Sequence, residues 1–109
     1  MNRLQGLIAA SFTPYKHGKI NPDVITDYAR GLAKNGLSGV FVNGTTGESL
    51  SLTVEERLEQ AEAWLDVAPE ELKVIVHVGH NSLPACQKMA AHAQEKGAWA
   101  FSAMAPTFF

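Results

Sequence analysis

Two hydroxyl side chains between two glycines are the residues of this sequence that point most directly to chemistry. Thr45 and Thr46 lie between Gly44 and Gly47, directly after the apolar run at 39–42. Glycine permits backbone angles that a side chain would resist, so we expect both glycines to shape a tight turn. Amides left unpaired in such a turn form a concave donor site for a small anion. The stretch therefore predicts a loop in which Thr45, Thr46 and Gly47 hold a carboxylate or a phosphate.

A structural role competes with this binding role, because plain connections between a strand and a helix use the same residue types. Phosphate is the less favoured anion, since a phosphate-binding P-loop places lysine after its second glycine. Here Glu48 follows Gly47, so an anion occupies the place of that cation.

Size, composition and charge exclude several classes of protein. The 109 residues suffice for one domain, 1–109, and 46% of them are hydrophobic, so a core can form. A net charge of −2 provides no basic face for nucleic acid and no polybasic surface for a membrane. No apolar run approaches the roughly 20 residues of a membrane helix, and we expect no secretory signal peptide, because residues 1–6 contain no long apolar region. Cys86 is the single cysteine, so we expect a reducing, cytoplasmic compartment.

Apolar runs and helical periodicities alternate along the chain. We expect strands at 7–12, 39–42, 73–79 and 98–105, and helices that end at Gly36, near Ala68 and at Gly97. The first strand is nearly continuously apolar, which is typical of a strand buried on both faces. A polar turn is expected at 16–19.

Each predicted helix has a start signal. Asn21 is expected to cap the first helix, Thr53 and Glu56 form a capping box for the second, and Asn81 or Ser82 caps the third. Helical spacing predicts the following buried residues: Val24, Ile25, Tyr28 and Leu32; Val54, Leu58, Ala61 and Leu65, with Trp64 beside them; Leu83, Cys86, Met89, Ala90 and Ala93.

The order βαβαβαβ predicts a parallel sheet with right-handed crossovers. An open doubly wound sheet and part of a (β/α)8 barrel both fit this order. In either fold, ligands bind beyond the carboxyl ends of the strands. Loops at Thr13, 44–49, 79–81 and 106–107 are therefore expected to converge on one face. His77 and His80 would not face one metal together, so no metal site is predicted.

One motif indicates a family: Val-Asn-Gly-Thr-Thr-Gly-Glu at 42–48, followed by Leu-Ser-Leu-Thr-Val-Glu-Glu-Arg at 50–57. Together with Leu-Gln-Gly-Leu-Ile-Ala-Ala at 4–10, Thr-Pro at 13–14 and His-Val-Gly at 77–79, it resembles the pyruvate-dependent class I aldolases. That family contains N-acetylneuraminate lyase and dihydrodipicolinate synthase. The resemblance extends over essentially the whole chain.

The resemblance implies a (β/α)8 barrel followed by further C-terminal helices, of which residues 1–109 are the N-terminal half. It implies that Thr45 and Thr46 bind the carboxylate of pyruvate or of the sialic acid, and that Thr46 and nearby amides do most of that binding. Enzymes of this family form a Schiff base between a barrel lysine and the ketone of pyruvate, and no cofactor is expected. That lysine and its assisting tyrosine lie beyond Phe109, so we expect the isolated chain to be inactive.

The last residues favour one branch of the family. Pro-Thr-Phe-Phe at 106–109 lacks the tyrosine hydroxyl that synthases commonly place after the fourth strand. The resemblance then implies a homo-oligomeric lyase that cleaves N-acetylneuraminate to pyruvate and N-acetylmannosamine. A dihydrodipicolinate synthase-like or other 2-keto acid aldolase is the alternative. Another is a non-catalytic truncated product that self-associates, since a half-barrel leaves two strand edges open.

Overall fold

Four short parallel strands form the central sheet of the computed structural model, which describes residues 3–104. In sheet order they are β1 (Ile8–Ala10), β4 (Gly39–Val42), β5 (Lys73–His77) and β6 (Ala100–Ser102). Ala9 lies beside Val40, which lies beside Val74. The strand order follows the chain order, so the sheet grows in one direction as the chain proceeds.

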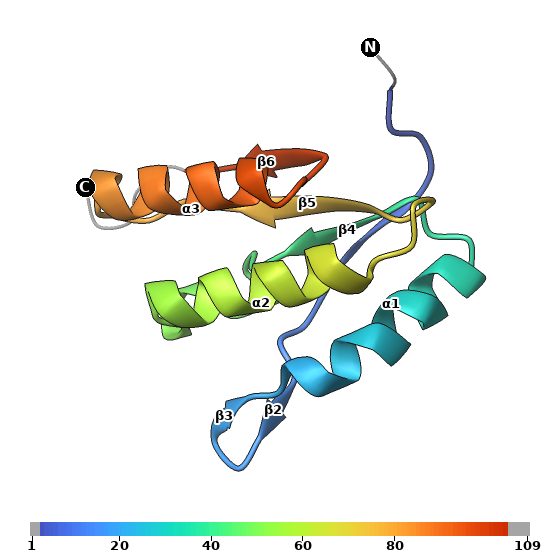
Figure 1. The fold of residues 1–109 in the computed structure, drawn as a ribbon, viewed down its shortest axis with the longest axis horizontal. Coiled ribbons are helices and arrows are strands. Elements are labelled where there is room, and N and C mark those ends of the chain that lie inside the picture. The colour runs from blue at the N-terminus through green and yellow to red at the C-terminus, as the bar shows by residue number, and fades with distance from the viewer. Residues whose placement is uncertain (1–2, 105–109) are drawn as a thin grey trace.

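Three helices connect successive strands: α1 (Ile25–Lys34), α2 (Val54–Val67) and α3 (Leu83–Glu95). Right-handed crossovers that always step the same way place every helix on the same face of the sheet (Figure 1). The core lies between these two layers. Its buried residues include Val40, Val42, Val74 and Val76 from the sheet and Ala29, Ala61, Trp64, Met89 and Ala93 from the helices. The predicted alternation of strands and helices is confirmed.

The expected polar turn at 16–19 is the tip of a small hairpin. Strands β2 (Tyr15–Lys16) and β3 (Lys19–Ile20) pair antiparallel. His17 and Gly18 connect them with φ of 54° and 77°, a left-handed pair suited to a two-residue hairpin loop. Strands of two residues are too short to show a hydrophobic periodicity, so the sequence predicted the turn but not the pairing of the two strands beside it.

The start of the first helix was wrongly predicted. A 3-10 turn, η1 (Pro22–Val24), precedes α1, and the Asn21 side chain makes no capping hydrogen bond. The other signals are confirmed. The Glu56 amide donates to the Thr53 hydroxyl over 3.0 Å, the Thr53 amide donates to the Glu56 carboxylate over 2.9 Å, and Ser82 caps α3. Gly36 and Gly97 follow α1 and α3 with positive φ.

Burial departs from the prediction on β1, on α2, on α3 and at Val24, which is 42% exposed rather than buried. The first strand is not buried on both faces, because β1 is an edge strand and helices cover only one face: Ile8 is 44% exposed. On α2 the most buried residues are Arg57, Gln60, Ala61 and Trp64, whereas the predicted Val54, Leu58 and Leu65 are only half-buried. On α3, Leu83 is exposed rather than buried.

Strand β6 is shorter at both ends than the strand predicted at 98–105. Residue 105 lies outside the described residues. The predictions for residues 106–109 also lie outside them.

No helix within residues 3–104 combines the length and the apolar character that crossing a membrane requires.

Candidate functional site

The loop after β4 is built differently from the prediction. Its left-handed residues are Asn43 and Glu48, with φ of 64° and 62°, and neither glycine of the motif has positive φ. Instead, the two glycines lie where other atoms of the chain come close to their Cα atoms. A Cβ atom on Gly44 would lie 2.5 Å from the Phe41 ring, and one on Gly47 would lie 3.2 Å from the Asn43 backbone. A Cβ on Gly44 would clash with the Phe41 ring and one on Gly47 would make a tight contact with backbone, so the glycines have a steric role and the expected reason was wrong.

Hydrogen bonds close this loop and leave donors unused. The amides of Glu48 and Ser49 donate to the carbonyls of Thr45 and Gly44 over 2.9 and 3.2 Å. The Thr13 hydroxyl donates to the Gly47 carbonyl over 2.6 Å and anchors the loop to the chain after β1. Within residues 3–104 the amides of Thr45, Thr46 and Gly47 donate to no carbonyl. Three consecutive N–H groups thus remain for a ligand or for water.

A cleft of about 490 Å³ opens beside this loop at the carboxyl end of the sheet. Its walls combine the loop after β4, the end of β5 and the chain after β6; they include Thr45, Glu48, Ser51, His77, Gly79, His80 and Met104. The predicted convergence of loops is confirmed for the part of the chain that the structure describes. Of the predicted site residues, Thr45 is exposed and lines the cleft, Thr46 is exposed but is not part of the cleft wall, and Gly47 is buried within the loop.

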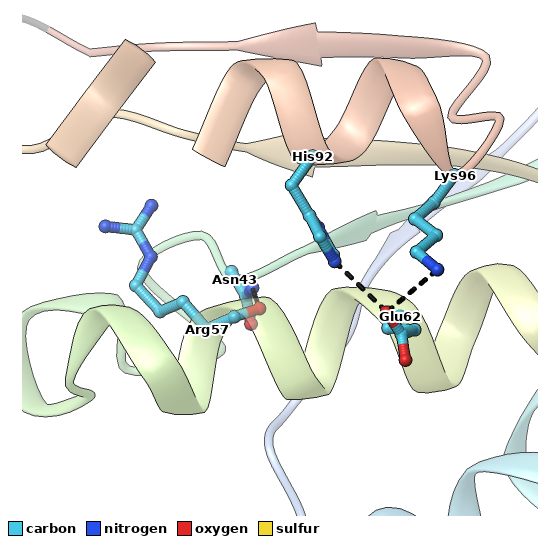
Figure 2. Close-up of polar contacts among 5 residues, drawn as sticks. All are labelled: Asn43, Arg57, Glu62, His92 and Lys96. Carbon is cyan, nitrogen blue, oxygen red and sulfur yellow. Dashed lines mark hydrogen bonds and ion pairs between the residues drawn. The ribbon is translucent and has the colours of Figure 1, made fainter. Parts of the chain in front are cut away.

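Arg57 is the residue at this site that the sequence analysis missed. It lies in the first turns of α2 and is only 2% exposed, yet its guanidinium reaches the cleft. It donates to the carbonyls of His77 and Gly79 over 2.7 Å each. The Asn43 side chain donates to the Arg57 carbonyl over 2.9 Å (Figure 2). Helical spacing could have predicted its burial, because Arg57 lies four residues before Ala61 and seven before Trp64, on the same side of α2.

Burial lowers the pKa of the Arg57 guanidinium, but a guanidinium stays charged in proteins. No carboxylate of residues 3–104 pairs with it. Its neighbour His77 is buried as well. Burial, and secondly the Arg57 charge, lower the pKa of His77, so the neutral imidazole is favoured. The cleft therefore contains a buried cation beside a neutral histidine.

The two histidines do not form a joint site. His80 Nδ1 accepts a hydrogen bond of 2.8 Å from the Ser82 amide, which is a local contact at the start of α3. Nowhere in residues 3–104 do three histidine, cysteine or acidic side chains gather in a metal-binding arrangement. Glu62 of α2 contacts His92 of α3 over 3.2 Å and Lys96, which directly follows α3, over 3.3 Å, on the helical layer (Figure 2).

Comparison with known families identifies the chain's relatives. Residues 3–109 match the model of the dihydrodipicolinate synthetase family, which is nearly the entire chain. The chain belongs to the dihydrodipicolinate synthetase family. The family resemblance predicted from the motif at 42–48 is thereby confirmed, and the parallel sheet is part of the family's (β/α)8 aldolase barrel.

Proteins similar to this chain include N-acetylneuraminate lyases and dihydrodipicolinate synthases. Human N-acetylneuraminate lyase is 48% identical over 109 residues, which is 97% of this chain and 34% of the human protein. The structure of Proteus mirabilis N-acetylneuraminate lyase superposes with a TM-score of 0.94 at 40% identity, covering 99% of this chain and 37% of that one. Dihydrodipicolinate synthase from Aquifex aeolicus gives a TM-score of 0.90 at 34% identity, covering 95% and 36%. The chain thus spans about a third of the length of these relatives.

Proposed function

We propose that this chain supplies the carboxylate-binding loop of a Schiff-base aldolase that cleaves N-acetylneuraminate to pyruvate and N-acetylmannosamine. The observation that carries the proposal is the row of three unused amides at Thr45, Thr46 and Gly47, at the carboxyl edge of the sheet. The names of relatives at 44–48% identity support the choice of substrate.

The proposed roles follow from the chemistry of a carboxylate. An ionised oxygen forms its strongest hydrogen bonds with fixed donors, and each is worth more than a neutral pair. In our proposal the Thr46 hydroxyl and the amides of Thr46 and Gly47 bind the carboxylate of the 2-oxo acid. Thr45, which faces the cleft, hydrogen-bonds the hydroxyl of a proton-shuttling tyrosine.

The Schiff-base lysine is assigned to a part of the barrel outside residues 1–109. Within the chain, Lys16, Lys19, Lys34, Lys88 and Lys96 are exposed on the hairpin or on helices. Lys73 starts β5, at the edge of the sheet opposite the cleft, and its ammonium donates to the Glu70 carbonyl over 2.9 Å. No lysine at these positions reaches the proposed carboxylate, so the chain alone is expected not to catalyse.

A hybrid enzyme tests the proposal. Residues 1–109 would replace the segment that they match in the Proteus mirabilis lyase, and pyruvate release from N-acetylneuraminate would be measured. We expect activity, and we expect Thr46→Val to lower kcat/KM by roughly 10- to 100-fold, because one charge-assisted hydrogen bond contributes about 1.5–3 kcal/mol. Thr26→Val on α1 is the matched control. Equal kcat/KM for the two variants would refute the carboxylate role of the loop.

A second hybrid distinguishes the alternative function, which the likeness to the Aquifex aeolicus synthase favours. The same residues would replace the matching segment of that synthase. We expect this hybrid to be much less active than the lyase hybrid, because residues 106–109 supply no tyrosine hydroxyl. The reverse order of activities would assign the chain to the synthase branch. A mass of two chains or more in size-exclusion chromatography would favour self-association of the isolated chain.

A further inference from the structure

We infer that Arg57 is a positioning residue that couples the loop after β4 to the loop after β5, and that it thereby sets the geometry of the carboxylate-binding loop. The second half of this inference rests on the proposed function. The first half, mechanical coupling of the two loops, does not.

The coupling is a short chain of hydrogen bonds between buried groups. Asn43 precedes the Gly44–Gly47 turn and is 1% exposed, and its side-chain amide donates to the Arg57 carbonyl over 2.9 Å. From the same residue the guanidinium donates 2.7 Å hydrogen bonds to the carbonyls of His77 and Gly79, where β5 ends. Among residues 3–104, Arg57 thus joins the two loops directly through its own hydrogen bonds.

The fork of the guanidinium is essential to this function. Its two terminal nitrogens hold two carbonyls that are two residues apart, and the planar group fixes their relative positions. A lysine would keep the charge at this site but would present a single ammonium instead of a rigid pair of donors. Comparison of arginine with lysine therefore separates geometry from charge.

The backbone at both ends of the connection needs such support. Asn43 has left-handed φ, which is uncommon for a residue other than glycine, and its buried side chain is held by the hydrogen bond to Arg57. Gly79 approaches the His77 ring so closely that a Cβ on it would lie 2.7 Å from the ring. Small shifts at either point would move the unused amides of the motif or the wall of the cleft.

Amide hydrogen exchange of the 109-residue chain tests the coupling without any ligand. The reporters are the amides of Glu48 and Ser49 in the first loop and of Val78 in the second, which all donate hydrogen bonds. We expect Arg57→Met and Arg57→Lys to accelerate exchange at all three by about tenfold or more, as the loss of a buried hydrogen bond would. The amides of Lys73 and Trp99, which donate at the opposite edge of the sheet, serve as internal references.

Arg30→Met is the matched control variant, because Arg30 lies on the exposed surface of α1. Unchanged exchange at the loop reporters relative to the references would overturn the coupling. Wild-type exchange in Arg57→Lys would show that charge, and not the fork, holds the loops, and would also overturn it.

The positioning role is tested separately in the lyase hybrid. There we expect Arg57→Lys to raise KM by about tenfold while kcat falls less, since the Schiff-base lysine lies elsewhere in the barrel. A change in kcat alone, or none, would overturn the role at the carboxylate site. An inactive hybrid with the arginine in place would instead count against the proposed function, and the exchange result would still decide the coupling.

Discussion

Replacement of Gln60 by methionine is expected to stabilise the protein. Gln60 is 1% exposed on the inner side of α2, and neither its amide nitrogen nor its carbonyl oxygen has a hydrogen-bond partner within residues 3–104. A buried polar atom without a partner costs about 1–3 kcal/mol, and methionine has a similar length without these atoms. The gain from Gln60→Met is therefore about 1–2 kcal/mol, once imperfect repacking is subtracted.

Urea and thermal unfolding followed by circular dichroism measure this gain. In a chain of about 100 residues, 1 kcal/mol shifts Tm by about 4–8 °C, so the variant should melt at least that much higher. Gln87→Met on the exposed side of α3 is the matched control and should change Tm little. An unchanged or lower Tm for Gln60→Met would mean that the amide is satisfied in the folded protein, and would refute the argument.

Three further changes probe the core and the titrating groups. Trp64 is fully buried and packs edge-on against Tyr28, so Trp64→Ala should lower the free energy of unfolding by about 3–5 kcal/mol in urea titrations, and a loss below 1 kcal/mol would contradict the described core. Burial lowers the pKa of His77 below its usual 6.5, so as pH falls the unfolded chain takes up this proton before the folded protein does. The free energy of unfolding should therefore fall as pH drops below about 6.5, and His77→Gln should weaken this pH dependence. Hydrogen bonds from His92, and secondly from Lys96, lower the pKa of Glu62. Glu62→Gln should therefore be less stable than wild type near neutral pH, and this difference should disappear as pH falls below 4.5. A difference that persists in acid would contradict this ion pair.

Much of the fold could be predicted because local signals and tertiary structure agree. The runs predicted as strands at 39–42 and 73–79 lie in the centre of the parallel sheet, although the second strand ends at His77, and Thr53 with Glu56 starts α2 as its sequence indicates. The alternation of such elements limits the topology to parallel strands with helical crossovers. These predictions use only interactions between residues that are close in sequence, so one sequence is sufficient to make them.

The site was harder, because its geometry depends on contacts between distant segments. Arg57 resembles a surface residue of a charged helix, and only the packing of α2 against the sheet buries it over the carbonyls that end β5. The left-handed conformation falls on Asn43 and Glu48 and not on the glycines, which instead lie where the chain comes close to Phe41 and Asn43. Propensity alone assigns such conformations to glycine.

The measurement that tests the central claim most directly is a titration of the 15N-labelled 109-residue chain with pyruvate, followed by NMR. If the loop after β4 holds the carboxylate, the amide signals of Thr45, Thr46 and Gly47 should shift together and saturate with a Kd of about 1 mM, which corresponds to about 4 kcal/mol. Acetone, which has the ketone but no carboxylate, should not shift them. Shifts confined to other residues, or the same shifts with acetone, would contradict a carboxylate site in this loop.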